Sequence, residues 1–261
     1  MLVLAGYAYF GYTWHNNDIR GVKQLTELFY KFREGNIMIM GTSQEVYQDF
    51  LYRIGQEEFR RPYRAVCENI RQELEEINEE YSRKLGRAFI SQITYRIKTP
   101  ESCLKKLIKK NQKVEWENAP AHLGDIAGVR VVCSFLDDVY RLAEMIIKRE
   151  NLEVIRIKDY VKKPKASGYQ SLHIIVLAPS EGKEKKKAEI QIRTQAMNFW
   201  AAVEHHFIYK NEDERFREDH ETNRFSRDLK DCARTIYRID QKMLTIRKKM
   251  EKAQQKGRKM T

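Results

Sequence analysis

Strict alternation of apolar and polar residues marks two stretches of this 261-residue chain as β-strands, Gly168–His173 and Ala188–Thr194. Successive side chains of a strand point to opposite faces of a sheet, so each stretch has one apolar and one polar face. The apolar faces carry Leu172, Ile174, Val176, Ile190 and Ile192. The polar faces carry Tyr169, Ser171, His173, Glu189, Gln191 and Arg193. Alternation alone favours a solvated sheet face over a functional site.

Apolar residues at helical spacing predict a helical segment before these strands, from Ser43 to Leu85. Pro62 interrupts this segment, and we expect it to begin a second helix, because proline is tolerated at the first helical position. Gly86 is expected to end that helix. Both helices are interpreted as scaffold.

The remaining chain alternates between the two patterns, which indicates a mixed α/β (α+β) fold. Strands are expected at Ala88–Lys98, Asp125–Phe135 and Leu152–Tyr160, and helices at Glu101–Lys110, Asp137–Glu150 and Ala196–Lys210. We expect Asp137 to cap its helix and Lys183–Lys187 to form the tip of a hairpin. From residue 225 an apolar stripe steps by four and three, which predicts a heptad seam that packs on a helix of the same subunit or of another. The seam consists of Phe225, Leu229, Cys232, Ile236, Ile239, Met243, Ile246 and Met250.

The first 37 residues differ in composition from the rest of the chain. Arg33-Glu34-Gly35 could be encoded by a purine-rich, ribosome-binding-like sequence, so we expect translation to begin at Met38 or Met40. The resulting division is an atypical extension (1–37), N-terminal helices (38–87), a core of alternating strands and helices (88–211) and a C-terminal helical extension with a heptad seam and a basic tail (212–261).

Charge and cysteine usage narrow the functional class. The formal net charge of +12 favours polyanionic partners such as nucleotides, nucleic acid or an anionic membrane, although solvated helix surfaces account for much of it. The four cysteines form no CxxC pair and three lie in apolar stretches, which indicates reduced thiols in a cytoplasmic protein. No apolar run is long enough to cross a bilayer, and the N-terminus lacks a basic signal-peptide region.

Basic and acidic side chains follow one another along the sequence in a pattern that suggests binding of phosphate groups. Arg96 and Lys98 end a predicted strand, and Ser102 and Lys106 lie on one side of the helix that follows. Helix-start amides with lysines form an anion site, although a basic surface helix explains them equally. Asp125 precedes a buried strand, where it is either a metal ligand or a turn cap.

The combined polar faces suggest two phosphorylated ligands joined at a divalent metal held by Asp125 and Glu189. Tyr169 offers a flat surface for a base. A core position for Tyr169 is disfavoured because its polar face offers nothing to pack on. Arg193 has an alternative role as an ion-pair partner that orients Glu189.

Six motifs follow one another along the chain. They are Arg96-x-Lys98-x-x-x-Ser102-x-x-x-Lys106, Asp125-Ile-Ala-Gly-Val-Arg130, Lys158-Asp-Tyr160, Lys165-x-x-Gly168-Tyr169-Gln-Ser-Leu-His173, Glu189-Ile-Gln-Ile-Arg193-Thr and Trp200-x-x-x-Glu204-His205. In this order they resemble the synthetase domain of the RelA/SpoT family of (p)ppGpp synthetases. A single such domain with a helical tail is similar to the small alarmone synthetases, nearest the RelP type.

The resemblance implies a nucleotidyltransferase-like mixed β-sheet flanked by helices, with helical extensions at both ends. It implies Mg²⁺-dependent transfer of the β,γ-pyrophosphoryl group of ATP to the 3′-hydroxyl of GDP or GTP. By motif position, ATP would be bound by Arg96, Lys98, Ser102, Lys106 and Arg130, and the guanine nucleotide by Lys158, Lys165, Tyr169, His173 and Glu204. Asp125 and Glu189 would be catalytic Mg²⁺ ligands, with Glu189 alternatively the base, and Gln191 and Arg193 would support them.

The resemblance also implies a homotetramer with helices at its interfaces. The family's hydrolase domain carries a His-Asp dyad, and no His-Asp pair occurs in this chain, so we expect synthesis without hydrolysis. The preference among GDP, GTP and GMP stays open, as does the identity of the general base. A rival hypothesis is a basic module that binds single-stranded RNA through Tyr169 and the lysines of Lys162–Lys165. Neither hypothesis predicts a membrane partner.

Overall fold

The structure, a computed structural model, describes residues 44–181, 184–210 and 220–258. The chain divides into two units, Met1–Gln44 and Glu45–Thr261, and the second contains the sheet together with the helices that pack on it. The proposed start sites Met38 and Met40 lie outside the described residues.

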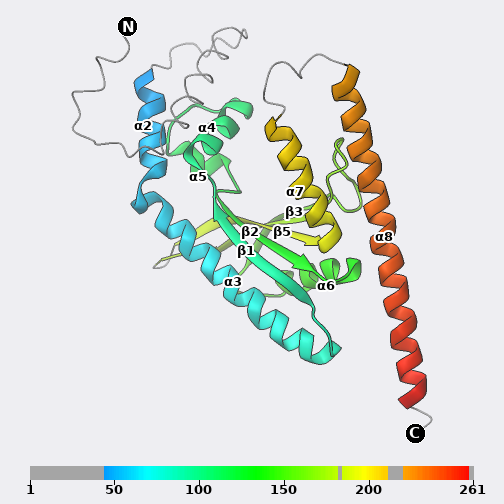
Figure 1. Ribbon diagram of the computed structural model, residues 1–261. Helices are drawn as coiled ribbons and strands as arrows, with labels where there is room; N and C mark the ends of the chain where they lie inside the picture. Colours follow the sequence, from blue (N-terminus) through cyan, green and yellow to red (C-terminus); the bar gives the residue numbers. More distant parts are fainter. Residues whose placement is uncertain (1–43, 182–183, 211–219, 259–261) are drawn as a thin grey trace, which may run out of the picture. The chain divides into compact units, whose positions relative to one another are not determined.

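Five strands form one mixed sheet (Figure 1). Their spatial order is β1 (Ile90–Ile97), β2 (Ala127–Cys133), β5 (Lys185–Thr194), β4 (Leu172–Pro179) and β3 (Glu153–Asp159). Strands β2 and β5 pair in parallel, and every other neighbouring pair is antiparallel. The expected α+β fold with a mixed sheet flanked by helices is therefore confirmed.

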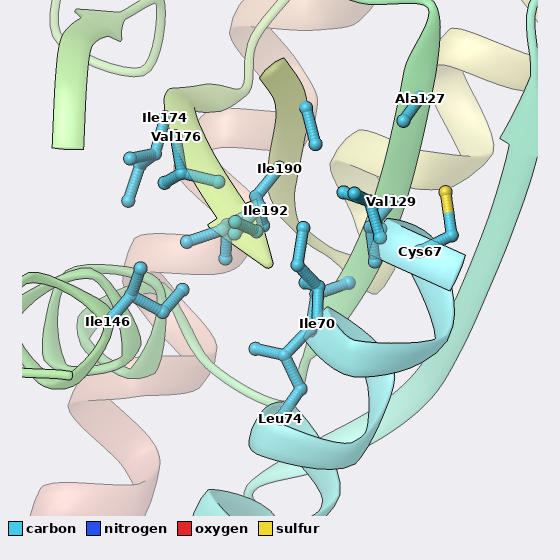
Figure 2. Packing of buried hydrophobic residues seen from close by; sticks show 14 of the residues in the cluster. Cys67, Ile70, Leu74, Ala127, Val129, Ile146, Ile174, Val176, Ile190 and Ile192 are labelled. Atoms are coloured by element: carbon cyan, nitrogen blue, oxygen red, sulfur yellow. The ribbon is translucent and has the colours of Figure 1, made fainter. Parts of the chain in front are cut away.

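Helices α3 (Glu57–Leu85) and α6 (Leu136–Ile147) cover the apolar face of this sheet. Figure 2 shows side chains of α3 and α6 packed against alternate residues of β2, β4 and β5. The alternation predicted for β5 is confirmed, since Ile190 and Ile192 are fully buried. Burial of such aliphatic side chains contributes about 1.5–3 kcal/mol each.

The other helices are α2 (Gln44–Gly55), α4 (Pro100–Lys109), α5 (Asn118–His122), α7 (Gln195–Lys210) and α8 (His220–Arg258). Thr99 caps α4, because its hydroxyl accepts a hydrogen bond from the backbone N–H of Ser102 at 3.3 Å. Gly86 ends α3 in the left-handed conformation, as expected (φ 62°).

Four local predictions are wrong. Pro62 does not begin a helix: α3 begins at Glu57, and the proline lies inside it. The break falls instead after Gly55, and one missing N–H does not outweigh the burial of the next turns. Strand β4 begins only at Leu172, so Gly168–Ser171 is a loop, and Lys185–Lys187 belong to β5 rather than to a hairpin tip.

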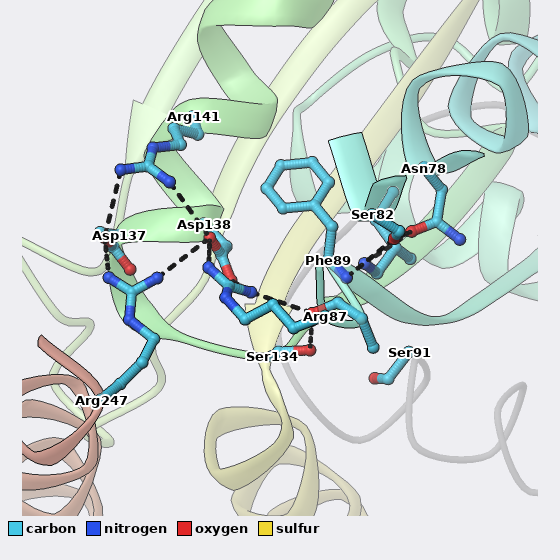
Figure 3. Close-up of polar contacts among 12 residues, drawn as sticks. Asn78, Ser82, Arg87, Phe89, Ser91, Ser134, Asp137, Asp138, Arg141 and Arg247 are labelled. Carbon is cyan, nitrogen blue, oxygen red and sulfur yellow. Dashed lines mark hydrogen bonds and ion pairs between the residues drawn. The ribbon is translucent and has the colours of Figure 1, made fainter. Parts of the chain in front are cut away.

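The fourth error concerns Asp137, which does not cap α6, because the helix begins before it at Leu136. Asp137 instead receives a 2.6 Å hydrogen bond from Arg247 of α8 (Figure 3). Its neighbour Asp138 is fully buried and held by both terminal nitrogens of Arg87, each at 2.7 Å. This ion-pair cluster ties α8 to the sheet domain.

Helix α8 has an inner and an outer face. Ala233, Asp240 and Arg247, spaced by seven residues, are buried against the rest of the subunit. The outer face is apolar and exposed, and carries Phe225, Ile239, Met243, Ile246 and Met250 of the predicted heptad seam. Most of the seam therefore has no partner within the described part of the subunit.

Among the described residues, no helix is long and apolar enough to cross a membrane. The four cysteines are free, and Cys67, Cys103 and Cys133 are buried, in agreement with the prediction of unpaired thiols.

Candidate active site

Polar side chains gather on the sheet face opposite α3 and α6, in two rows that cross all five strands. Strand pairing aligns Arg96, Gly128, Glu189, Ile175 and Arg156 in the first row. It aligns Thr94, Arg130, Gln191, His173 and Lys158 in the second. Residues directly opposite each other in paired strands share a face, so predicted site residues from all five strands lie on one surface.

Asp125 lies at the entry to β2 between two lysines. Its Oδ2 is 3.1 Å from Nζ of Lys98 and 2.5 Å from Nζ of Lys106, on α4. Burial would raise the pKa of Asp125, but hydrogen bonds and charges from Lys106 and Lys98 outweigh it and lower the pKa. Ser102, one turn before Lys106, accepts a 3.0 Å hydrogen bond from the hydroxyl of Thr99.

Asp125 and Glu189 open on the same side of the sheet. Gly124, the residue before Asp125, lies against Ile175, which is the cross-strand neighbour of Glu189. Lys106 binds Asp125 directly, and its charge also lowers the pKa of Glu189. Both acids are thus within electrostatic reach of one ammonium group.

Five side chains around Glu189 form a closed ring of polar contacts. The Tyr169 hydroxyl is 2.8 Å from Nε2 of His173, whose Nδ1 is 3.1 Å from Oε1 of Glu189. Gln191 donates to Oε2 of Glu189 at 2.7 Å. Arg193 closes the ring, donating to Gln191 at 3.1 Å and to the Tyr169 hydroxyl at 2.6 Å. Arg193 therefore supports Glu189 through Gln191 and Tyr169 rather than through a direct ion pair.

The ring keeps Glu189 ionised. Burial alone would raise the pKa of this carboxyl, but the hydrogen bond and charge of His173, helped by Gln191 and Lys106, lower it to about 2. Because the His173 nitrogen that faces the carboxylate must carry the hydrogen, Nδ1 is the donor. Glu189 is therefore an anion at every pH at which the protein would work.

Tyr169 is buried, and the expectation that it has nothing to pack on is wrong. Only 9% of its surface is exposed, and it clusters with Trp200, Ala201 and Ala233, from α7 and α8. Two cations also lie against its ring: Nζ of Lys165 at 4.6 Å and the Arg193 guanidinium at 5.0 Å from the centroid.

Lysines and a glutamate surround this aromatic group. Burial lowers the pKa of Lys165, and the charges of Lys158 and Lys106 lower it further, while those of Glu189 and Glu204 raise it. All four groups thus act on one ammonium, which brings predicted guanine-nucleotide residues from β3, α7 and the loop together.

Three guanidinium groups face one another nearer to β1. Burial lowers the pKa of Arg130, and the charges of Arg193 and Arg96 lower it further. Within the described part of the chain, the buried Nε of Arg130 has no hydrogen-bond partner. Like charges held together without counter-ions are suited to an anionic or an aromatic ligand.

Tyr160 also belongs to this site, although the motif Lys158-Asp-Tyr160 predicted no role for it. The Tyr160 ring meets His173 edge-on at 5.1 Å and lies 5.0 Å from Nζ of Lys165. Its position just after a strand with a polar face was the available signal.

The two carboxylates fit Mg²⁺ better than they fit a metal ion whose ligands all come from the protein. No group of three or more His, Cys, Asp or Glu residues capable of holding a metal occurs in the described ranges. The buried Oδ1 of Asp125 has no hydrogen-bond partner among the described residues. Mg²⁺ is commonly held by one or two carboxylates together with substrate phosphates, and Asp125 and Glu189 are of that chemical type.

Comparison with known proteins identifies the family. The family described as "Region found in RelA / SpoT proteins" matches residues 95–214. GTP pyrophosphokinase YwaC of Bacillus subtilis is 37% identical over 179 residues, which cover 67% of this chain and 82% of that protein. The chain belongs to the RelA/SpoT family. A second member, GTP pyrophosphokinase YjbM of Bacillus subtilis, is 33% identical over 76% of this chain and 91% of its own length.

A solved structure narrows the assignment to small alarmone synthetases, as the motifs predicted. Small alarmone synthetase 1 from Bacillus subtilis, bound to its product pppGpp, superposes with a TM-score of 0.65 and 33% identity. The match covers 74% of this chain and 96% of that one. None of these three RelA/SpoT relatives is described as an RNA-binding module, so the rival hypothesis has no support.

Proposed function

We propose that this member of the RelA/SpoT family synthesises the bacterial alarmone (p)ppGpp. It transfers the β,γ-pyrophosphoryl group of ATP to the 3′-hydroxyl of GDP or GTP. One observation carries the proposal: Asp125, just before β2, and Glu189, on β5, are both within reach of Lys106. The relative solved with pppGpp supports the same conclusion.

ATP binds at the β1–α4 side of the sheet. Arg96 and Arg130 flank the adenine, and their guanidinium planes stack on its ring. Lys98, Ser102 and Lys106 bind the phosphates, and the positive end of the α4 dipole near Ser102 adds to the attraction for anions.

The guanine nucleotide binds at the β3–β4 side. Tyr169 stacks on the base, His173 and Glu204 lie beside the nucleoside, and Lys158 and Lys165 bind its phosphates. Because Tyr169 is buried and Lys165 lies on its ring, the base must displace the lysine to stack. Lys165 is then free to bind a phosphate of the same nucleotide.

Asp125 and Glu189 would hold Mg²⁺. When bound, the metal neutralises phosphate charge and polarises the transferred group. A pKa of about 2 makes Glu189 a weak general base, because proton transfer is most efficient when the base's pKa is near the working pH. The lowered pKa therefore supports an anionic ligand role for Glu189 that orients the 3′-hydroxyl through a hydrogen bond. Gln191 and Arg193 keep the carboxylate in place.

The exposed apolar face of α8 supports a homo-oligomer, which by similarity to the family is a tetramer. Since both substrates are cytoplasmic nucleotides, we expect the enzyme to act in the cytoplasm.

Incubation with γ-labelled ATP, Mg²⁺ and GDP, GTP or GMP, followed by separation of the products, tests the proposal. Labelled guanosine products are expected from GDP or GTP. Labelled ppGpp incubated separately without ATP should remain intact, because hydrolysis is not expected. Glu189→Gln should lower the rate about 1,000-fold. The exposed Glu153→Gln, in a weak surface pair with Lys185, is the matched control and should leave the rate unchanged. A folded wild-type protein that labels no guanine nucleotide would refute the proposal.

A further inference from the structure

The loop that carries Tyr169 rests on the inner face of α8. At Gly168, φ is +97°, a conformation that favours glycine. A β-carbon placed on Gly168 would lie 2.8 Å from Cβ of Ala233 and 3.1 Å from Cα of Lys230. The loop backbone and the helix are therefore as close as two chains can pack, which requires small residues on both sides.

No free space remains at this contact. The gap between the loop, α7 and α8 is too narrow to hold a water molecule. It is lined by Gly168, Gln170, Met197, Trp200, Ala233 and Ile236. A larger side chain on the helix side would therefore press on the loop.

Hydrogen bonds hold the inner face of α8 in place. The Trp200 indole N–H donates to the backbone carbonyl of Leu229 at 2.9 Å, one turn before Ala233. Further along, Asp240 accepts a 2.6 Å hydrogen bond from Thr194, the last residue of β5. These bonds fix the helix relative to α7 and to the strand that carries Glu189.

We propose that Ala233 is a positioning residue for the guanine nucleotide: by its small size it sets the position of Gly168, and thereby that of Tyr169. Ala233 acts only through the loop and touches no substrate. The proposal rests on the proposed function, because it assumes that Tyr169 stacks on guanine. The residues assigned to ATP lie on β1, β2 and α4, so a shift of this loop affects the two substrates unequally.

The test is a graded series, Ala233→Val and Ala233→Leu, with direct measurement of GDP binding by calorimetry and of kcat and KM for both substrates. Ala233→Leu should raise the Kd and KM for GDP about tenfold, since displacements of about 1 Å in a site have effects of this size or larger. The KM for ATP should stay within about twofold. The valine variant should give a smaller change in the same direction, and it answers the question if the leucine variant does not fold.

Thr235→Leu is the matched control, because Thr235 is exposed on the same helix two residues away, and its GDP affinity should equal that of the wild type. Unchanged GDP affinity in both Ala233 variants would overturn the inference and leave the proposed function intact. Parallel increases in both KM values with a lower Tm would also overturn it, by indicating a merely structural role. A wild type that binds GDP but makes no product refutes the proposed function alone, and a wild type that does not bind GDP refutes both.

Discussion

Nδ1 of His173 lies 3.1 Å from Oε1 of Glu189, and this contact is the main reason why a buried carboxyl keeps a low pKa. Removing the imidazole leaves burial opposed only by Gln191 and Lys106. The protonation of Glu189 in the folded protein then moves to higher pH.

His173→Ala should therefore move the acidic limb of the pH–rate profile upward and lower kcat/KM for GDP about 100-fold. In the wild type, protonation of Glu189 contributes nothing to the profile above pH 5, since its pKa is about 2. Steady-state rates between pH 5 and 9 are the measurement. His122→Ala, on the surface of α5, is the control. An unmoved acidic limb in His173→Ala would contradict this account of the carboxylate.

Tyr169→Phe separates stacking from hydrogen bonding. The phenylalanine keeps the ring but loses the hydroxyl contacts with His173 and Arg193. We expect the KM for GDP to rise about fivefold, the worth of about one hydrogen bond, whereas Tyr169→Ala should raise it about 50-fold. Equal effects of the two substitutions would show that the ring does not bind the base.

Asp240 should make the fold less stable as the pH rises, whereas most carboxylates have the opposite effect. Burial raises the pKa of Asp240 to about 6, although the hydrogen bond from Thr194 lowers it in part. Between about pH 4 and pH 6 the folded state holds more protons than the unfolded state, so this group's effect on stability becomes unfavourable as pH rises.

Asp240→Asn removes the charge and keeps an oxygen for Thr194. It should raise the free energy of unfolding by about 2 kcal/mol at pH 8 and change it little at pH 4, as measured by urea denaturation. Asp228→Asn, a substitution at an exposed position of the same helix, should show no such pH dependence. A gain of equal size at both pH values would exclude titration of Asp240 as the cause.

Arg87 and Asp138 form a buried pair whose disruption should be costly. Arg87→Ala leaves the fully buried carboxylate with only longer contacts to Arg141 and Arg247, near 4 Å, and should lower the free energy of unfolding by about 3 kcal/mol. The double variant Arg87→Met with Asp138→Leu should recover most of this loss.

Arg64→Ala is the comparison for that pair. Arg64 and Glu57 form an exposed ion pair, whose loss should cost less than about 1 kcal/mol. If Arg87→Ala costs no more than Arg64→Ala, the buried pair of Arg87 and Asp138 does not stabilise the fold.

The sequence predicted the sheet and its polar face because strand side chains alternate with a period of two. The sequence alone shows that the polar residues Glu189, Gln191 and Arg193 alternate with two isoleucines, Ile190 and Ile192. The structure keeps this alternation because the neighbouring strands β2 and β4 pair with β5 so that their polar residues lie on the same face.

The burial of Tyr169 could not be predicted in this way. It depends on Trp200 and Ala233, more than 30 residues further along the chain, which come over the loop only after α7 and α8 pack. The predicted helix starts at Pro62 and Asp137 were also wrong, because α3 begins at Glu57 and α6 begins at Leu136. At α6 the first helical residue, Leu136, is buried, so packing decided that boundary and the capping preference of about 1 kcal/mol did not.

The parallel pairing of β2 with β5 makes this chain unusually sensitive to the length of one segment. An insertion or deletion of one codon within Lys185–Thr194 would invert the strand, sending a carboxylate, an amide and a guanidinium inward and two isoleucines outward. Folding and chemistry would be lost in the same step. Among natural variants of this enzyme, changes of length should therefore be absent from β5 even where substitutions are frequent.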